Sequence, residues 1–303
     1  MNGQEKSPWT QLSSSFAETI TALENSIVAI DSGGRSTSSG VVWRPGVIVT
    51  THHSLHPRED IKVLCSREPL SARFLGSDAT TDVAVLGVDS DNLIPAQIAS
   101  GLVMGAGEIV LSIGRSRLGD ISASCGIMAR TGSAWRSWRG GSIDQLIRPD
   151  IRLYVGQAGS ALVNEKRQVL GINSPALARQ AVITIPAQTI SRVVDSIIEI
   201  GHVPRPFLGL AMQPVPTPEP ARQFLSASVD EVLLVTHVEP KAPAALAGVM
   251  VGDVIVLFNE KPVPGMREML HRLRDSRIGD TISLTVFRGG AKVDLTVTVA
   301  DRG

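Results

Sequence analysis

Short apolar segments in close succession are the feature that most limits how this chain can fold. From residue 26 to about 186 they follow one another with only Gly, Ser, Asp and Pro between them. The segments are "SIVAID", "SGVVW", "GVIVT", "DIKVLC", "ARFLG", "DVAVLGV", "EIVLSIG", "ISASCGIMAR", "DQLIR", "QVLGI" and "AVITI". Because strands this closely spaced leave no room for the helices of a parallel α/β sheet, they predict a mainly β fold, either a sandwich or a barrel.

A helix and a Pro-rich segment then divide the chain. The stretch "AQTISRVVDSIIEIG" places apolar residues on one helical face and ends at Gly201, a C-cap residue. The apolar positions are Ile190, Val193, Val194, Ile197 and Ile198. The next segment, "HVPRPFLG", predicts a linker at 202–206. Residues 207–303 contain strand segments and two helical ones, 242–248 and 265–275, which predicts a second, mainly β domain.

Composition excludes several classes of partner and cofactor. Lys and Arg number 29 and Asp and Glu number 29, so the net charge of zero makes nucleic acid and anionic membranes poor partners. Cys65 and Cys125 lie in apolar strand segments without metal-ligand spacing, and we expect them to be small core residues. No metal or organic cofactor is therefore expected.

The sequence also bears on location. No stretch approaches the ~18 apolar residues of a membrane span, and the N-terminus has no apolar segment typical of a secretory signal. We expect a soluble, cytoplasmic protein as the sequence stands, or a periplasmic or extracytoplasmic one if a signal was removed before Met1.

Three stretches of the first domain carry residues that belong to one kind of chemistry. "GVIVTTHHSL" puts His53 after an apolar strand, "GSDATTDVAVLGV" puts Asp82 at the start of another, and "YVGQAGSALVN" supplies a Gly-rich turn centred on Ala158. In this order the arrangement resembles the trypsin-like serine proteases. More narrowly it resembles the HtrA family, whose corresponding segments read like "TNNHV", "SDxxTDLAVL" and "GNSGGPLVN".

The resemblance implies a fold and a domain plan. Residues 26–201 would form a trypsin-like double six-stranded β-barrel, and residues 207–303 a PDZ domain with two helices. Residues 1–25 would be an N-terminal segment containing a short helix, for which the sequence shows helical spacing over 11–24. Family resemblance also suggests a homotrimer built through this segment, around Trp9 and Phe16.

The resemblance further implies roles for the three stretches. His53 would be the general base and Asp82 would orient it, while the backbone amides around Gly156, Gln157 and Ala158 would form the oxyanion hole. Ala158 stands at the nucleophile position and has no atom that attacks a carbonyl. Ser160, two residues along the turn, is a poor substitute because its side chain is expected to point elsewhere. We therefore expect no useful hydrolysis from this sequence.

The origin of Ala158 stays open. A long-inactive descendant should also have lost His53 and Asp82, which favours a single Ser-to-Ala change in a competent enzyme. The neighbouring Gln157, Ser160 and Ala161 also depart from the family pattern, which favours a natural pseudoprotease. Two functions follow: an endopeptidase for unfolded or C-terminally tagged proteins in protein quality control, or a scaffold or holdase that binds peptides.

The substrate pocket gives a weaker signal. Arg152, six residues before Ala158, corresponds to the pocket floor of trypsin-like folds, but a solvated Arg152 is an alternative. Ile183 in "AVITIP" suits the small apolar residues that HtrA-like enzymes prefer. The segment "ARTGSAWRSWRGGS" predicts an exposed loop, which in the family lies near loops that respond to activation and by itself could equally be a contact patch.

The C-terminal domain resembles an HtrA-type PDZ domain through "VTHVEPKAPAALAGVMVGDVIVLFNEKPV". The segment "PFLGL" takes the place of the carboxylate-binding loop, so amides of Leu208, Gly209 and Leu210 would capture a peptide C-terminus. Leu210, Met269 and Leu273 would line the pocket for the terminal side chain. The alternative is that "FLGL" is only a core strand. The expected partners are unfolded polypeptides or protein C-termini.

Overall fold

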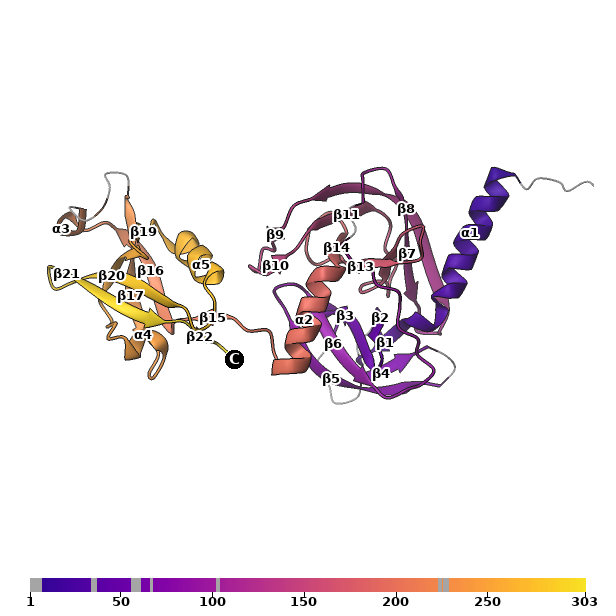
Figure 1. Ribbon diagram of the computed structural model, residues 1–303, viewed down its shortest axis with the longest axis horizontal. Helices are drawn as coiled ribbons and strands as arrows, with labels where there is room; N and C mark the ends of the chain where they lie inside the picture. The colour runs from indigo at the N-terminus through magenta and orange to yellow at the C-terminus, as the bar shows by residue number, and fades with distance from the viewer. Residues whose placement is uncertain are drawn as a thin grey trace, which may run out of the picture. The chain divides into compact units, whose positions relative to one another are not determined.

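The protein divides into two compact units, Met1–Val203 and Pro204–Gly303. The computed structural model describes residues 7–33, 37–55, 61–65, 68–101, 104–222, 225 and 229–303. Figure 1 shows strands dominating both units. Among the described residues, no helix is long and apolar enough to cross a membrane.

The first unit begins with a closed antiparallel barrel in the order β1-β2-β3-β6-β5-β4. Its strands are β1 Ile27–Asp31, β2 Ser38–Arg44, β3 Val47–Thr51, β4 Ile61–Leu64, β5 Leu70–Asp78 and β6 Val83–Val88. The β1–β4 pairing closes it, with Ile30 opposite Val63. Ile30, Ile48 and Leu86 fill its interior. Every residue of β6 is buried, because this strand has the barrel interior on one side and other parts of the fold on the other.

A second closed barrel follows in the order β11-β14-β13-β12-β7-β8. Its strands are β7 Ile109–Arg115, β8 Ile121–Gly132, β11 Leu146–Asp150, β12 Ala161–Val163, β13 Val169–Ser174 and β14 Ile183–Pro186. Met128, Leu162 and Leu170 belong to its interior cluster. Two six-stranded barrels confirm the predicted mainly β, trypsin-like fold of this unit.

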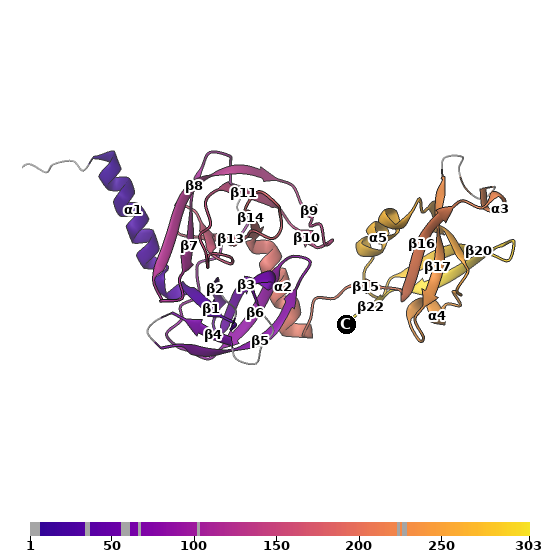
Figure 2. The ribbon, with the colours of Figure 1, turned by 180° about the vertical axis from the view of Figure 1, so that it is seen from behind.

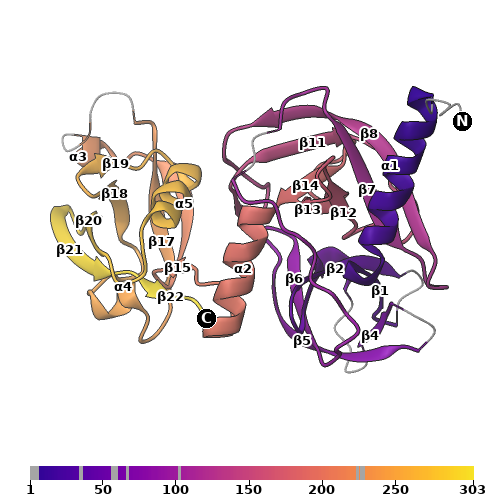
Figure 3. The same cartoon turned by 45° about the vertical axis from the view of Figure 1, so that its right-hand side comes forward.

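Helix α2, Ala187–Ile200, packs against strands of both barrels, namely β5, β6, β13 and β14 (Figure 3). Ile190, Val193, Val194 and Ile197 are buried in the large apolar cluster that both barrels share. Ile198 was predicted on the same face but is 49% exposed, because the buried face of the helix ends at Ile197. Gly201 ends the helix at φ +92° and its amide donates to the Ile197 carbonyl, as a C-cap glycine does.

The N-terminal helix α1, Pro8–Ala22, starts earlier than the sequence predicted. Ser7 caps it by accepting from the Thr10 amide, and Pro8 occupies the first helical position. Phe16 and Ile20 pack against the apolar cluster of the first unit. A 3₁₀ turn, η1 Glu24–Ser26, connects the helix to β1.

Two local predictions were wrong in this unit. The segment expected to be a loop forms a small hairpin, β9 Trp135–Arg136 with β10 Ser142–Ile143. Cys125 is exposed and is not a core residue, whereas Cys65 is partly buried and packs against the core of the first barrel. On β8 the inward side belongs to residues such as Met128, and strand alternation turns Cys125 outward.

The second unit contains a sheet in the order β16-β17-β18-β20-β21, with α4 and α5 in contact with its strands. Its elements are β15 Pro206–Phe207, β16 Leu210–Pro216, α3 Glu219–Arg222, β17 Glu231–Val238, α4 Pro243–Leu246, β18 Val254–Phe258, β19 Lys261–Pro262, α5 Met266–Asp275, β20 Thr281–Arg288, β21 Ala291–Thr298 and β22 Ala300–Asp301. Figure 2 shows α5 beside β16, and the two elements are in contact. A separate core includes Leu233, Ile255 and Leu284, as expected of a PDZ domain.

Candidate active site

Strand pairing brings His53 to Asp82. His53 lies in the 3₁₀ turn η2, His52–Ser54, directly after β3, and Asp82 directly precedes β6. Because Thr51 of β3 pairs with Val83 of β6, the residues flanking these ends are neighbours. His53 Nδ1 lies 2.8 Å from Asp82 Oδ2 and 3.1 Å from Oδ1, and the His53 amide donates to Oδ1 at 2.9 Å.

The geometry of this pair defines what the imidazole can do. A carboxylate only accepts hydrogen bonds, so Nδ1 is the donor and Nε2 is left as the acceptor. Asp82 is 3% exposed, whereas the His53 side chain is 28% exposed and is accessible to a substrate. The pair therefore has the arrangement of a general base held by a buried carboxylate.

Asp82 is held in an uncommon backbone conformation, at φ +63°. The Ser174 hydroxyl donates to Asp82 Oδ2 at 2.6 Å and the Asp82 carbonyl accepts from the His52 amide at 3.1 Å. Ser174 ends β13 and was not singled out in the sequence, where a serine in "GINSPAL" carries no distinct signal. Its contact with Asp82 depends on how the two barrels meet.

The turn containing Ala158 is ordered by backbone hydrogen bonds. Gly156 and Gly159 take φ +89° and +81°, which explains glycine at both positions. The Gly159 amide donates to the Asn173 carbonyl at 2.9 Å, and the Asn173 amide donates to the Ser160 carbonyl at 2.8 Å. Since Asn173 adjoins Ser174, β13 connects this turn to the residue that holds Asp82.

The backbone amides of the Ala158 turn differ in whether they are free to donate to an oxyanion. The Gln157 amide donates to the Tyr154 carbonyl at 3.0 Å, which corrects its expected place in an oxyanion hole. The Gln157 side chain is buried and bonded, accepting from the Tyr154 amide and donating to the Ser122 hydroxyl. Within the described part of the chain, the amides of Gly156 and Ala158 have no acceptor. These two are the donors left for an oxyanion.

Ser160 does not replace the missing nucleophile. It is fully buried, and its hydroxyl lies 3.0 Å from the Ser112 hydroxyl and 3.1 Å from Asn173 Nδ2. Ala158 is only partly buried. The side chain at 158 thus reaches the surface of the turn, while that at 160 points into the second barrel.

The two predicted pocket residues lie in different surroundings. Arg152 is exposed, which agrees with the alternative of a solvated side chain. Its guanidinium lies 5.4 Å from the centre of the Tyr154 ring. Ile183 is 5% exposed, begins β14 and pairs with Ser174. The β9–β10 hairpin contacts the turn before Asp82, because the hydroxyl of Ser137, between the two hairpin strands, donates to the Thr80 carbonyl at 2.5 Å.

The predicted peptide site of the second unit starts with a turn. Gly209, at φ +78°, lies between β15 and β16, so the segment "FLGL" is interrupted by a turn and is not one continuous strand. Leu208 is 2% exposed, and its carbonyl accepts from the Ala244 amide at 2.9 Å. Among the described residues, the amides of Leu208 and Gly209 have no backbone acceptor. Gly209 has no room for a side chain, because a Cβ there would collide with Ala242.

The apolar residues near this turn are not equally accessible. Leu210 and Leu273 are partly buried, whereas Met269 is fully buried and belongs to the core. The predicted pocket therefore has Leu210 and Leu273 at its surface. In the described sheet β16 is an end strand, so one of its edges is unpaired.

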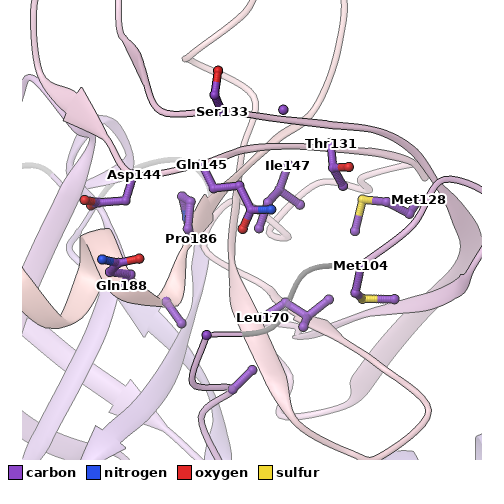
Figure 4. Close-up of a pocket in the computed structure, with 14 residues that line it drawn as sticks. Met104, Met128, Thr131, Ser133, Asp144, Gln145, Ile147, Leu170, Pro186 and Gln188 are labelled. Carbon is purple, nitrogen blue, oxygen red and sulfur yellow. The ribbon is translucent and has the colours of Figure 1, made fainter.

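A cavity of about 240 Å³ opens elsewhere, into the second barrel (Figure 4). Met104, Met128 and Leu170 form its apolar part, and Gln145 lies at its centre in the view. Neither His53, Asp82 nor the 156–160 turn lines it. We assign the reactive chemistry to the His53–Asp82 region, because among the described residues no histidine lines this cavity and the one carboxylate that does, Asp144, is already bonded to Thr189 and Arg192. In the described residues, no group of three or more His, Cys, Asp or Glu is arranged to hold a metal.

Comparison with known proteins agrees with both units. Residues 38–172 match the trypsin-like peptidase domain, and residues 206–299 match the PDZ domain. The serine protease Do-like HtrA of Lactobacillus helveticus is 31% identical over 281 residues, covering 86% of this chain and 68% of that protein. The chain belongs to the HtrA family of serine proteases.

Other HtrA relatives extend this agreement. The serine endoprotease DegS of Salmonella typhimurium is 28% identical and covers 88% of this chain and 77% of its own length. A probable periplasmic DegP-like endoprotease of Pseudomonas savastanoi is 32% identical, and the chain spans 56% of that protein's length. Among solved structures, a serine endoprotease from Yersinia pestis is 25% identical, with a TM-score of 0.69 and coverage of 95% and 98% of the two chains. The HtrA-type protease AlgW, solved with a decapeptide, matches with 25% identity and a TM-score of 0.68, covering 95% of this chain and 99% of its own.

Proposed function

We propose that this chain has the catalytic arrangement of an HtrA-like serine endopeptidase acting on unfolded or C-terminally tagged proteins, and lacks only the nucleophilic oxygen at position 158. The observation that carries the proposal is the His53–Asp82 pair, with an Nδ1–Oδ2 distance of 2.8 Å. The Ala158 turn is connected through Ser39 to Thr50 on the strand before His53, and two of its amides have no acceptor among the described residues. A chain that binds peptides without cleaving them has no need for either feature.

The chemistry follows from these groups. With a hydroxyl at position 158, His53 Nε2 would accept the hydroxyl proton as the oxygen attacks the scissile carbonyl, and would return that proton to the leaving amine. The amides of Gly156 and Ala158 would donate to the oxyanion, each contributing about 3 to 4 kcal/mol by analogy with other proteases. Loss of the nucleophile alone costs about 10⁶-fold in turnover in another serine protease, so hydrolysis by the present sequence is negligible.

The decisive experiment restores the oxygen. The Ala158→Ser variant is expected to cleave an unfolded casein-like substrate, while the original chain does not. The matched control is Ala158→Ser combined with His53→Ala, which keeps the hydroxyl and removes the base. If Ala158→Ser folds normally and yet cuts nothing, the endopeptidase proposal is wrong.

The second candidate is a natural pseudoprotease that binds peptides as a scaffold or holdase. It is favoured by Ala158 itself and by the buried Gln157 and Ser160 side chains, which depart from the family pattern. The unpaired edge of β16 and the amides at Leu208 and Gly209 support binding of an extended peptide C-terminus. Pro214 lies in β16 and has no N–H, so pairing is restricted to the first residues of the strand.

Peptide binding can be tested on the full chain. A fluorescent peptide with an apolar C-terminal residue is expected to bind, and its C-terminally amidated form is expected not to bind. Equal affinity of the two forms would exclude capture of the carboxylate. Binding in an Ala158→Ser variant that remains inactive would support the pseudoprotease.

Assembly and location are further parts of the proposal. Trp9 is 80% exposed on α1, whereas Phe16 packs on its own protomer, so Trp9 is the aromatic side chain available to a homotrimer. Light scattering of the protein and of Trp9→Ala would test this, and a monomer at micromolar concentration would exclude it. Of the two locations left open by the sequence, the periplasmic description of the Pseudomonas relative supports the extracytoplasmic one.

A further inference from the structure

We propose that Ser39 is a positioning residue that helps to fix the direction of the Ala158 amide, one of the two oxyanion donors in the Ala158 turn. This inference rests on the proposed endopeptidase function. Ser39 is the second residue of β2 in the first barrel and is fully buried. The turn that it contacts belongs to the second barrel and lies more than a hundred positions away, since its hydrogen bond to Gly156 spans 117 residues.

The amide, the hydroxyl and the carbonyl of Ser39 are all hydrogen-bonded, the first two to the Ala158 turn. Its amide donates to the Ala158 carbonyl at 2.8 Å, and its hydroxyl donates to the Gly156 carbonyl at 2.8 Å. Its own carbonyl accepts from the Thr50 hydroxyl at 2.7 Å. Thr50 is three residues before His53 on β3, so one serine connects the turn with the strand that leads to the base.

The direction of the Ser39 hydroxyl is determined by its second partner. The Arg115 amide donates to Ser39 Oγ at 3.0 Å, so the hydroxyl proton must point to another acceptor. The Gly156 carbonyl is at 2.8 Å, and the alternative, the Arg115 carbonyl, is at 3.5 Å. The Ser39 hydroxyl therefore donates its proton to the Gly156 carbonyl, the nearer of the two acceptors.

The Arg115 amide is itself held in place. The Arg115 side chain is 3% exposed and donates to the carbonyls of Ile27, Glu24 and Gly119 at 2.7, 2.5 and 2.5 Å. The bonds to Ile27 and Glu24 anchor the end of β7 against β1 and η1, and the bond to Gly119 holds the turn between β7 and β8. Arg115 thus presents its amide to Ser39 from a fixed position.

The consequence for the turn follows from peptide planarity. In the 156–157 peptide, the oxygen bonds to Ser39 and the N–H donates to Tyr154. In the 158–159 peptide, the oxygen also bonds to Ser39 and the N–H donates to Asn173. The peptide between these two carries the Ala158 N–H, and its oxygen, the Gln157 carbonyl, accepts from the Ser160 amide at 3.0 Å. Because each peptide is a rigid plane, fixing both neighbours restricts the direction of that N–H.

Close packing leaves Ser39 no alternative position. A Cβ on Gly114 would lie 2.6 Å from the Ser39 hydroxyl oxygen, and one on Gly159 would collide with the Ser39 carbonyl. Both glycines let backbone approach this serine. Without the hydroxyl, the Gly156 carbonyl would lose its partner and the 156–157 peptide would be held at one end only.

The test uses the Ala158→Ser enzyme as the parent and compares two neighbouring serines. Ser39→Ala is expected to lower kcat by about 10- to 100-fold with little change in KM, since a misdirected donor costs less than the 10²- to 10³-fold of a deleted one. Ser38→Ala is the matched control. Ser38 is also buried, but the one hydrogen bond of its hydroxyl within the described residues is a 3.5 Å contact with Thr50, so kcat should stay within about twofold. Ser39→Cys, which keeps a donor at this position but a weaker and larger one, should fall between parent and Ser39→Ala.

A second measurement does not depend on activity. In the original Ala158 chain, Ser39→Ala should accelerate amide hydrogen exchange of the segment 154–160, and Ser38→Ala should not. If Ala158→Ser is active but Ser39→Ala matches Ser38→Ala in kcat and exchange, the role of Ser39 is refuted. If Ala158→Ser is inactive, the proposed function fails, and the exchange measurement still decides whether Ser39 orders the turn.

Discussion

Asp78 is the residue whose replacement best tests how the turn before Asp82 is held. It ends β5, is 2% exposed, and accepts from the Thr80 amide at 3.0 Å, the Thr80 hydroxyl at 2.7 Å and the Thr81 hydroxyl at 2.8 Å. Each hydrogen bond to a charged group contributes about 1.5 to 3 kcal/mol. The three together give an upper limit of about 4.5 to 9 kcal/mol, because removing Asp78 also removes the cost of burying its charge.

We expect Asp78→Ala to lower the free energy of unfolding of the first unit by about 3 to 5 kcal/mol. For a unit of this size, the unfolding temperature should fall by about 2 to 4 °C per kcal/mol, or about 6 to 20 °C in all. In the Ala158→Ser background, activity should fall as well, because the same turn positions Asp82. Asp78→Asn keeps one acceptor oxygen and should cost less, about 1 to 2 kcal/mol.

Tryptophan fluorescence measures this effect in the intact chain. All four tryptophans lie in the first unit, at positions 9, 43, 135 and 138, so the signal reports on that unit alone. The control is Asp195→Ala, which breaks a 2.7 Å ion pair with Arg44 in which the Asp195 side chain is 47% exposed. Such surface pairs contribute about 0 to 1 kcal/mol. Equal losses in Asp78→Ala and Asp195→Ala would refute the reasoning.

Three further predictions follow from burial and backbone conformation. Gly209→Ala should destabilise the second unit by at least about 1 to 2 kcal/mol because Gly209 has φ +78°, and hydrogen exchange unchanged in that unit would contradict this. Ile190→Ala should cost about 2 to 5 kcal/mol and Ile198→Ala much less, as the two side chains on α2 are 0% and 49% exposed; urea midpoints that fall equally would count against the helix orientation. Burial raises the pKa of both Cys125 and Cys65, so iodoacetamide should alkylate both thiols slowly near neutral pH and faster as the pH rises. Cys125 is the exposed one and should be modified first, as followed by mass spectrometry. The reverse order would contradict the structure.

The strands of both units and helix α2 were predictable because they rest on patterns within a few residues. The interval between apolar segments indicated short strands without helices between them, and the spacing from Ile190 to Ile197 indicated the buried face of α2. The burial of residues at the margin of an apolar pattern was predicted less reliably. Ile198 and Cys125 are both apolar in the sequence, and only the position of the neighbouring strands turns them outward.

The candidate site was predictable only in part. The segments around His53, Asp82 and Ala158 match a family pattern, so the residues that would react were visible in the sequence. Their supports were not, because Ser174 and Ser39 are common residues without a local signature. Gln157 was misplaced for a related reason, since the partner of its amide is set by how the turn closes on Tyr154.

By itself the sequence indicated most strands of the two barrels and helix α2, and it established that position 158 has no nucleophilic atom. These are properties of neighbouring residues, of backbone preference at Gly and Pro, and of side-chain chemistry. Only the tertiary structure decided which amides of the Ala158 turn have acceptors among the described residues and which side chains hold that turn in place. Those outcomes depend on the meeting of two barrels, where residues more than a hundred positions apart satisfy each other's buried polar groups.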